Sequence, residues 1–379
     1  MKTAFDGVFA GKTVLVTGHT GFKGSWLSLW LQELGANVVG FALPPEAEPS
    51  LFSQLGLARL IDSRLGDIRE AALVRQVFEE TRPEIVFHLA AQPLVRLSYE
   101  FPVETFSVNV VGTANVLDAV RVTDSVRVCQ VITTDKCYEN LEADYAYRED
   151  DRLGGRDPYS ASKACAELVV ASYRASFFSG PGAASISSTR AGNVIGGGDW
   201  AKDRLVPDCA RALAAGQPIP VRSPRSVRPW QYVLEPLSGY LRLASRQWAE
   251  PMAYAEAWNF GPKLGTARSV GEIADHVVRS WGSGRWLNLS ADSSVPHEAG
   301  LLQVDSAKAA KRLQWQPVYE LHEGIQKTMD WYRASQQPGF EALEMTRTQL
   351  ARFTAAAAKA GLPWAGEEST EAAAMAASL

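Results

Sequence analysis

The stretch GHTGFKGSW, residues 18–26, follows the apolar run at 14–16 and places glycines at positions 18, 21 and 24. A glycine-rich turn between a strand and a helix aims backbone N–H groups at a pyrophosphate. The first glycine makes the turn, the second admits the phosphates, and the third lets helix and strand pack closely. The pattern therefore predicts a dinucleotide-binding loop that comprises Gly18, Thr20, Gly21, Phe22, Lys23 and Gly24.

Short apolar runs alternate with helical stretches after this loop. Strands are expected at 12–18, 36–43, 84–91, 126–134 and 183–195, and helices at 24–34, 70–80, 103–121 and 159–178. Strands that are apolar on both faces and separated by helices predict an α/β fold with a doubly wound parallel Rossmann sheet. A dinucleotide would bind at the carboxyl ends of its strands.

After about residue 195 the composition of the sequence changes, and loops rich in glycine, proline and tryptophan follow. This change predicts a smaller, interleaved C-terminal substrate-binding lobe. The expected division is a Rossmann domain at 1–190 with a segment returning to it near 230–262, a substrate lobe at 191–350, and a flexible tail at 355–379.

Composition argues against several classes of protein. The 379 residues carry a net charge of −4 with both signs scattered, so no basic surface for nucleic acid is expected. The sequence has no signal-peptide pattern and no run of about 18 apolar residues, which predicts a cytoplasmic protein without a membrane partner. The four cysteines and five histidines show no ligand spacing, so no metal is expected.

A second motif, YSASK at 159–163, predicts redox chemistry. Tyr159 and Lys163 stand at i and i+4, on one face of a helix. An ammonium close to a phenol stabilises the phenolate, so Tyr159 is expected to have a lowered pKa and to accept a hydroxyl proton as hydride leaves. Thr134, at the end of the preceding strand, supplies a hydroxyl for the same substrate oxygen.

The three glycines spaced by three and the Thr, Tyr and Lys set resemble those of the extended short-chain dehydrogenase/reductases. The resemblance implies NAD as the cofactor. It also places Asp67 and Ile68 against the adenine, and Leu89, Ala90, Ala91 and Thr133 beside the cofactor. The second strand ends in VGFALPP, residues 39–45, without the usual ribose-binding carboxylate or an arginine for a 2′-phosphate. That position therefore does not distinguish NAD from NADP.

The segment TTDKCYEN, residues 133–140, carries Asp135 and Lys136 directly after Thr134. It resembles the nucleotide-sugar 4,6-dehydratases, and in particular the branch that acts on CDP-glucose. The stretches HLAAQPLV (88–95), RAGNVIGGGDW (190–200) and RPWQYVLEP (228–236) share this resemblance, although Tyr232 stands where that branch is expected to have histidine. The resemblance implies that substrate is bound by Gln92, Asn193, Arg204, Leu205 and Arg228.

The same resemblance implies a dehydration that is redox-neutral overall, a step of deoxysugar biosynthesis. Tyr159, helped by Lys163 and Thr134, takes the C4 hydroxyl proton while hydride moves to NAD. A base removes the C5 proton, Asp135 protonates the departing C6 hydroxyl, and the hydride returns to C6. Lys136 stands where other members have a glutamate base, and it can act only as the free amine.

In this family the helices at 103–121 and 159–178 pair across a two-fold axis, so a homodimer is expected; the sequence leaves open whether dimers pair again. Two alternative functions stay open. One is a 4-epimerase, or a dehydratase acting on a UDP, GDP or dTDP sugar. The other is a non-catalytic dinucleotide-sensing protein.

Overall fold

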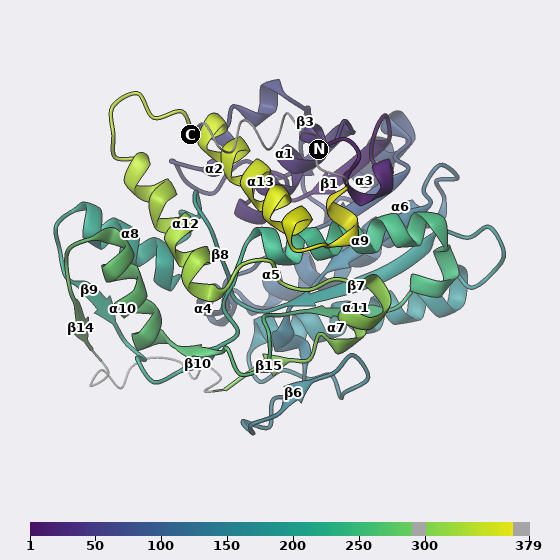
Figure 1. Ribbon diagram of the computed structural model, residues 1–379. Helices are drawn as coiled ribbons and strands as arrows, with labels where there is room; N and C mark the ends of the chain where they lie inside the picture. The colour runs from purple at the N-terminus through teal and green to yellow at the C-terminus, as the bar shows by residue number, and fades with distance from the viewer. Residues whose placement is uncertain (290–300, 367–379) are drawn as a thin grey trace.

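The computed structural model describes residues 1–289 and 301–366, and it is built around one parallel sheet (Figure 1). The seven strands follow the order β12-β7-β5-β4-β1-β2-β3. All neighbouring strands run parallel, which is the arrangement of a doubly wound sheet. The predicted fold class is confirmed. The strands are β1 (Thr13–Thr17), β2 (Asn37–Ala42), β3 (Asp62–Leu65), β4 (Ile85–His88), β5 (Val128–Ile132), β7 (Ser185–Ala191) and β12 (Ala257–Phe260).

Helices cover both faces of the sheet because the side chains of a strand point alternately to its two sides. In β1, Val14 and Val16 join one hydrophobic core, and Leu15 joins another. The first core is closed by α1 (Phe22–Glu33) and α9 (Leu234–Ala249). The second is closed by α3 (Ala71–Thr81), α6 (Thr113–Arg121) and α7 (Pro158–Phe177).

The helix expected at 103–121 is divided into three parts. After α4 (Val95–Glu100), α5 (Pro102–Phe106) leads into a π-helical turn, Ser107–Gly112, before α6 begins. Asn109 in this turn donates to the Gln92 carbonyl at 3.1 Å and to the Ser162 hydroxyl at 2.9 Å. Single π turns are often found at functional sites, and this one connects the loop after β4 to helix α7.

The smaller lobe follows β7. Helix α8 (Leu205–Ala214) packs against α10 (Val270–Trp281), and beside them the parallel pair β9 (Ile219–Val221) and β14 (Trp286–Asn288) completes the lobe (Figure 1). Between these elements the chain returns to the sheet, where β12 pairs with β7. The remaining elements are α2 (Leu51–Gln54), β6 (Ala146–Tyr147), β8 (Val194–Ile195), β10 (Val227–Arg228), β11 (Gln231–Tyr232), β13 (Arg268–Ser269), β15 (Gln303–Val304), α11 (Ala307–Leu313) and α12 (Leu321–Ala334).

The C-terminal region differs from the flexible tail expected at 355–379. Helix α13 (Ala342–Lys359) continues past residue 355, and the following Trp364 is fully buried. Its ring stacks on that of Phe5, with centroids 4.9 Å apart and planes 5° from parallel. The alanine-rich composition gives no sign of this packing, because Phe5, on which Trp364 stacks, lies at the other end of the chain. Residues 367–379 lie outside the described residues.

Within the described ranges, no helix combines the length and the apolar character that crossing a bilayer requires.

Candidate active site

The glycine loop has the backbone geometry that a dinucleotide requires. Gly18 adopts a φ of +79°, a conformation that residues with a Cβ rarely take. A Cβ on Gly24 would lie 2.0 Å from the Gly18 carbonyl oxygen, and one on Gly18 would lie 2.7 Å from the Ala90 nitrogen. These close approaches bring the N-terminus of α1 next to the carboxyl ends of β1 and β4. The residues present therefore fit a dinucleotide at this position.

The other predicted cofactor residues line the same edge of the sheet. Ala90 donates from its backbone nitrogen to the Thr17 hydroxyl at 3.2 Å, which holds the segment Leu89–Ala91 beside the glycine loop. Asp67 follows β3 and pairs with Arg69. Burial acts to raise the pKa of Asp67, but the hydrogen bonds from Arg69 outweigh it and keep that carboxyl ionised. Ile68 is buried next to Gly112 of the π turn.

Two histidines near this edge are neutral structural groups. His19, inside the glycine loop, is fully buried; its Nε2 lies 2.7 Å from the Ser63 hydroxyl, and its ring fills the space beside Gly40 of β2. Burial lowers the pKa of His19 to about 4. His88 contacts the hydroxyls of Thr17 and Thr113 through its two ring nitrogens, and burial lowers its pKa to about 3.

Strand β5 and helix α7 bring Thr134, Tyr159 and Lys163 together. Asp157 caps α7 by accepting from the Ser160 nitrogen at 2.9 Å, and Pro158 occupies the first turn, where its missing N–H costs nothing. Tyr159 is 8% exposed. Lys163, one turn later, donates from Nζ to the Ile132 carbonyl at 3.3 Å, so helix and strand are joined next to the phenol.

The electrostatics of Tyr159 differ from the expected lowering by Lys163. Burial raises the pKa of Tyr159 to about 12, while a hydrogen bond with Thr134 and the charge of Arg204 act in the opposite direction. Burial also lowers the pKa of Lys163 to about 8. The low-dielectric position of both groups disfavours their charged forms.

Asp135 and Lys136 occupy a short 3-10 turn, Asp135–Cys137, that begins directly after Thr134. Asp135 is 1% exposed; its Oδ1 lies 3.0 Å from the Thr134 hydroxyl, and its Oδ2 is buried with no partner in the described part of the chain. Oδ2 faces Gly192, where an added Cβ would lie 2.9 Å away. Asp135 and the half-buried Lys136 both lie in the described part of the chain and form no ion pair with each other. The two charges therefore do not neutralise each other by direct pairing.

Two further cations, Lys23 and Arg204, lie near Asp135 and Tyr159. Lys23 of the glycine loop points inward to the Tyr240 hydroxyl at 3.4 Å, and burial, reinforced by the charges of Lys163 and Arg204, lowers its pKa to about 7. Arg204 pairs with Asp199 at 3.0 Å, and this pairing raises the pKa of the guanidinium. The site thus combines one unpartnered carboxylate oxygen with several cations, a setting suited to an anionic ligand.

The predicted substrate residues differ in the hydrogen bonds that their side chains make within the protein. Gln92 uses its amide locally, donating to Thr105 at 2.8 Å and accepting from the Leu94 nitrogen at 2.5 Å. Asn193 has a buried Oδ1 without a partner in residues 1–289 and 301–366. Leu205 begins α8, directly after Arg204. Arg228 is 4% exposed and donates to the Val227 carbonyl at 3.0 Å.

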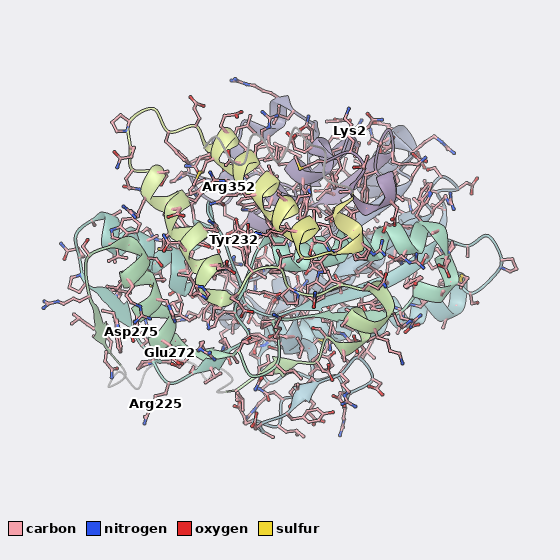
Figure 2. All side chains as sticks on the ribbon, viewed as in Figure 1. Lys2, Arg225, Tyr232, Glu272, Asp275 and Arg352 are labelled. Carbon is pink, nitrogen blue, oxygen red and sulfur yellow. The ribbon has the colours of Figure 1, made fainter. Side chains whose placement is uncertain are left out.

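Tyr232, which stands where the CDP-glucose branch is expected to have histidine, belongs to the hydrophobic core. Its side chain is 2% exposed, and its hydroxyl donates to Gln349 of α13 at 2.8 Å (Figure 2).

The sequence did not predict the buried ion pair between Glu167 and Arg190, at 2.8 Å. In the sequence, the only sign of this ion pair is that Glu167 follows Lys163 by four residues and so lies on the same face of helix α7. Among the described residues, no three His, Cys, Asp or Glu side chains gather to hold a metal ion.

A doubly wound sheet, a three-glycine loop at its switch point and a buried Thr, Tyr and Lys set define the short-chain dehydrogenase/reductase class. The chain is similar to a solved UDP-glucose 4-epimerase from Thermotoga maritima, with a TM-score of 0.72 and 21% identity over 86% of this chain and all of that one. It is also similar to a dTDP-glucose 4,6-dehydratase from Bacillus anthracis solved with NAD, with a TM-score of 0.69 and 18% identity over 85% and 97% of the two chains.

The sequence matches the GDP-mannose 4,6 dehydratase family over residues 15–328, and the chain belongs to that family. It is 50% identical over 329 residues to CDP-glucose 4,6-dehydratase of Salmonella typhimurium, covering 86% of this chain and 91% of the relative. The predicted membership of the nucleotide-sugar 4,6-dehydratases is thereby confirmed.

Proposed function

We propose that this protein is a CDP-glucose 4,6-dehydratase, which converts CDP-D-glucose to CDP-4-keto-6-deoxyglucose and water. The observation that carries the proposal is the turn after β5, where the buried Asp135 and the neighbouring Lys136 follow Thr134 without pairing with each other. An epimerase needs no further acid and base at this place. The 50% identity to a CDP-glucose enzyme supports the nucleotide and the sugar.

NAD is the proposed cofactor, held by the loop of Gly18, Gly21 and Gly24, by Asp67, and by the segment after β4. Solved 4,6-dehydratases of the same fold contain NAD. The bound cofactor supplies a hydride acceptor that is restored within each turnover.

The residues of the chain have separate tasks in the proposed reaction. Tyr159 takes the proton of the C4 hydroxyl, with Thr134 and Lys163 beside it. Oxidation at C4 acidifies the C5 proton, which Lys136 removes as the free amine. Asp135 protonates the departing C6 hydroxyl through its buried Oδ2, which faces Gly192 and has no partner in the described residues. General acid and base catalysis of this kind contributes about 10²–10⁴-fold each.

The proposed substrate lobe, residues 191–350, packs against a cofactor domain at 1–190. Arg204 and Arg228 offer guanidinium groups, which suit a diphosphate because they donate two parallel hydrogen bonds. Asn193 adds an amide oxygen that has no protein partner in the described residues. These groups support binding of a nucleotide diphosphate sugar by the proposed substrate lobe.

The exposed apolar side chains on α5, the π turn and α7 support a homodimer. Val103 is 82% exposed, Val111 52% and Leu168 59%, on the helices that the sequence assigned to an interface. A second copy packed there would remove this surface from water. The four cysteines are free, which fits a reducing compartment, and we place the reaction in the cytoplasm.

The test is to incubate the purified protein with CDP-glucose and, separately, with UDP-, GDP- and dTDP-glucose. Loss of one water by mass from CDP-glucose, at a higher rate than from the other sugars, is the expected result. Unchanged mass with inversion at C4 would mean an epimerase. Unchanged mass and configuration with every sugar would mean a dinucleotide sensor and would contradict the proposal.

A further inference from the structure

A buried ion pair joins helix α7 to strand β7 behind the catalytic residues. Oε2 of Glu167 accepts from NH2 of Arg190 at 2.8 Å, and both side chains are no more than 4% exposed. The hydroxyls of Thr133 and Ser188 donate to the same carboxylate. A buried ion pair is retained only where further hydrogen bonds satisfy its charges. This pair therefore forms a rigid connection between the sheet and the helix that carries Tyr159.

The other end of Arg190 holds the segment that follows the acid and base. Its NH1 donates to the Tyr138 hydroxyl at 2.8 Å and to the Glu149 carbonyl at 2.9 Å. The Tyr138 hydroxyl in turn donates to Oδ1 of Asn259, on β12, at 2.7 Å. Tyr138 is 1% exposed, and its ring stacks on Tyr147 with centroids 5.2 Å apart. The hydroxyl thus anchors the end of the turn in which Asp135 and Lys136 lie.

We propose that Tyr138 is a positioning residue for the elimination, because it anchors the turn that carries Asp135 and Lys136. Arg190 then sets the distance between this turn and Tyr159, which acts in the oxidation at C4. This inference rests on the proposed function. The two halves of the reaction occur on one sugar ring, so the residues that act at C4 and those that act at C5 and C6 must keep a constant separation. Arg190 provides this constant separation because its guanidinium binds both Glu167 of α7 and Tyr138, the residue directly after the turn.

The arrangement predicts that the Tyr138 hydroxyl affects the two half-reactions unequally. Its loss leaves the bond between Arg190 and Glu167 in place, so Tyr159 and Lys163 keep their geometry. The 3-10 turn loses its anchor, and Asp135 and Lys136 gain freedom to move. A displacement of about 1 Å at a reacting group costs up to about 10²-fold in rate.

The test is the variant Tyr138→Phe, which keeps the ring, its stacking on Tyr147 and its contact with the Arg190 guanidinium. In single turnover with CDP-glucose, reduced cofactor is expected to form within about twofold of the wild-type rate, while water loss slows about tenfold or more. Reduced cofactor then accumulates and is seen by its near-ultraviolet absorbance. Its formation also shows that the variant folds and binds NAD.

The matched control is Tyr145→Phe. Tyr145 lies in the same loop but is 43% exposed, and its hydroxyl contacts Asp151 rather than Arg190. This variant is expected to match the wild type in both steps. Equal slowing of both steps in Tyr138→Phe, or no change in either, would overturn the positioning role. Failure of the wild-type protein to release water from any nucleotide sugar would instead count against the proposed function.

Discussion

The Thr134 hydroxyl donates to Oδ1 of Asp135 at 3.0 Å, and the same side chain acts to lower the pKa of the Tyr159 phenol. One hydroxyl therefore lies between the group that acts at C4 and the group that acts at C6 in the proposed reaction. Thr134 can occupy this position because β5 ends in a buried segment and the 3-10 turn reverses the chain immediately after it.

Replacing Thr134 by valine is expected to move the pH dependence of C4 oxidation upward. Tyr159 acts as the phenolate; burial raises its pKa to about 12, and the Thr134 hydrogen bond lowers it. Without that bond the pKa rises further, and below the pKa the phenolate fraction falls tenfold for each unit. We expect C4 oxidation near pH 7 to slow about tenfold and to recover as the pH rises.

The measurement is single-turnover formation of reduced cofactor across a pH series, with Thr134→Ser as the variant that keeps the hydroxyl. A Thr134→Val rate that is reduced by the same factor at every pH would show that the hydroxyl acts by position alone.

Lys136→Ala is expected to abolish water loss while partial C4 oxidation survives. The ammonium takes part in no ion pair with its neighbour Asp135, so its removal leaves that carboxyl in its present surroundings. A trace of bound, reduced cofactor should appear by absorbance when CDP-glucose is added, without a change in mass of the sugar. Normal dehydration by this variant would show that Lys136 is not the base.

Gly24→Ala is expected to disrupt the cofactor loop. The new Cβ would meet the Gly18 carbonyl oxygen at 2.0 Å, a backbone contact that no side-chain rotation can relieve. Such overpacking costs about 1–3 kcal/mol of stability, and NAD affinity measured by calorimetry should fall about tenfold or more as α1 moves away from β1.

Gly180→Ala is the matched control for this substitution because an added Cβ there meets nothing within 4 Å. Wild-type NAD affinity in Gly24→Ala would mean that the loop does not bind the cofactor.

Trp364→Ala is expected to lower the free energy of unfolding by about 3–5 kcal/mol. The indole is fully buried and stacks on Phe5, so its loss leaves a cavity between the two ends of the chain. Urea denaturation gives the value, and Leu264→Ala, at a side chain 58% exposed, serves as the control. An equal, small effect of both substitutions would indicate that the C-terminal segment is not part of the cooperative unit.

The features that depend on neighbouring residues could be predicted from the amino-acid sequence. The spacing of Gly18, Gly21 and Gly24 after an apolar strand predicted the loop, and the i, i+4 spacing placed Tyr159 and Lys163 on one helix face. Alternating apolar runs predicted the parallel sheet, because a strand covered on both faces must be apolar on both. The positions of Thr134 and Asp135 at a strand end then placed them at the carboxyl edge.

Other features depend on contacts between distant residues and are visible only in the folded chain. Trp364 is buried against Phe5, Tyr232 donates to Gln349, and Arg190 joins Glu167 to Tyr138. The pKa of Tyr159 is also decided there, since burial by the surrounding elements is the largest effect on it and raises it. Local patterns specify which groups a segment presents, whereas burial and pairing are set by what the rest of the chain packs against them.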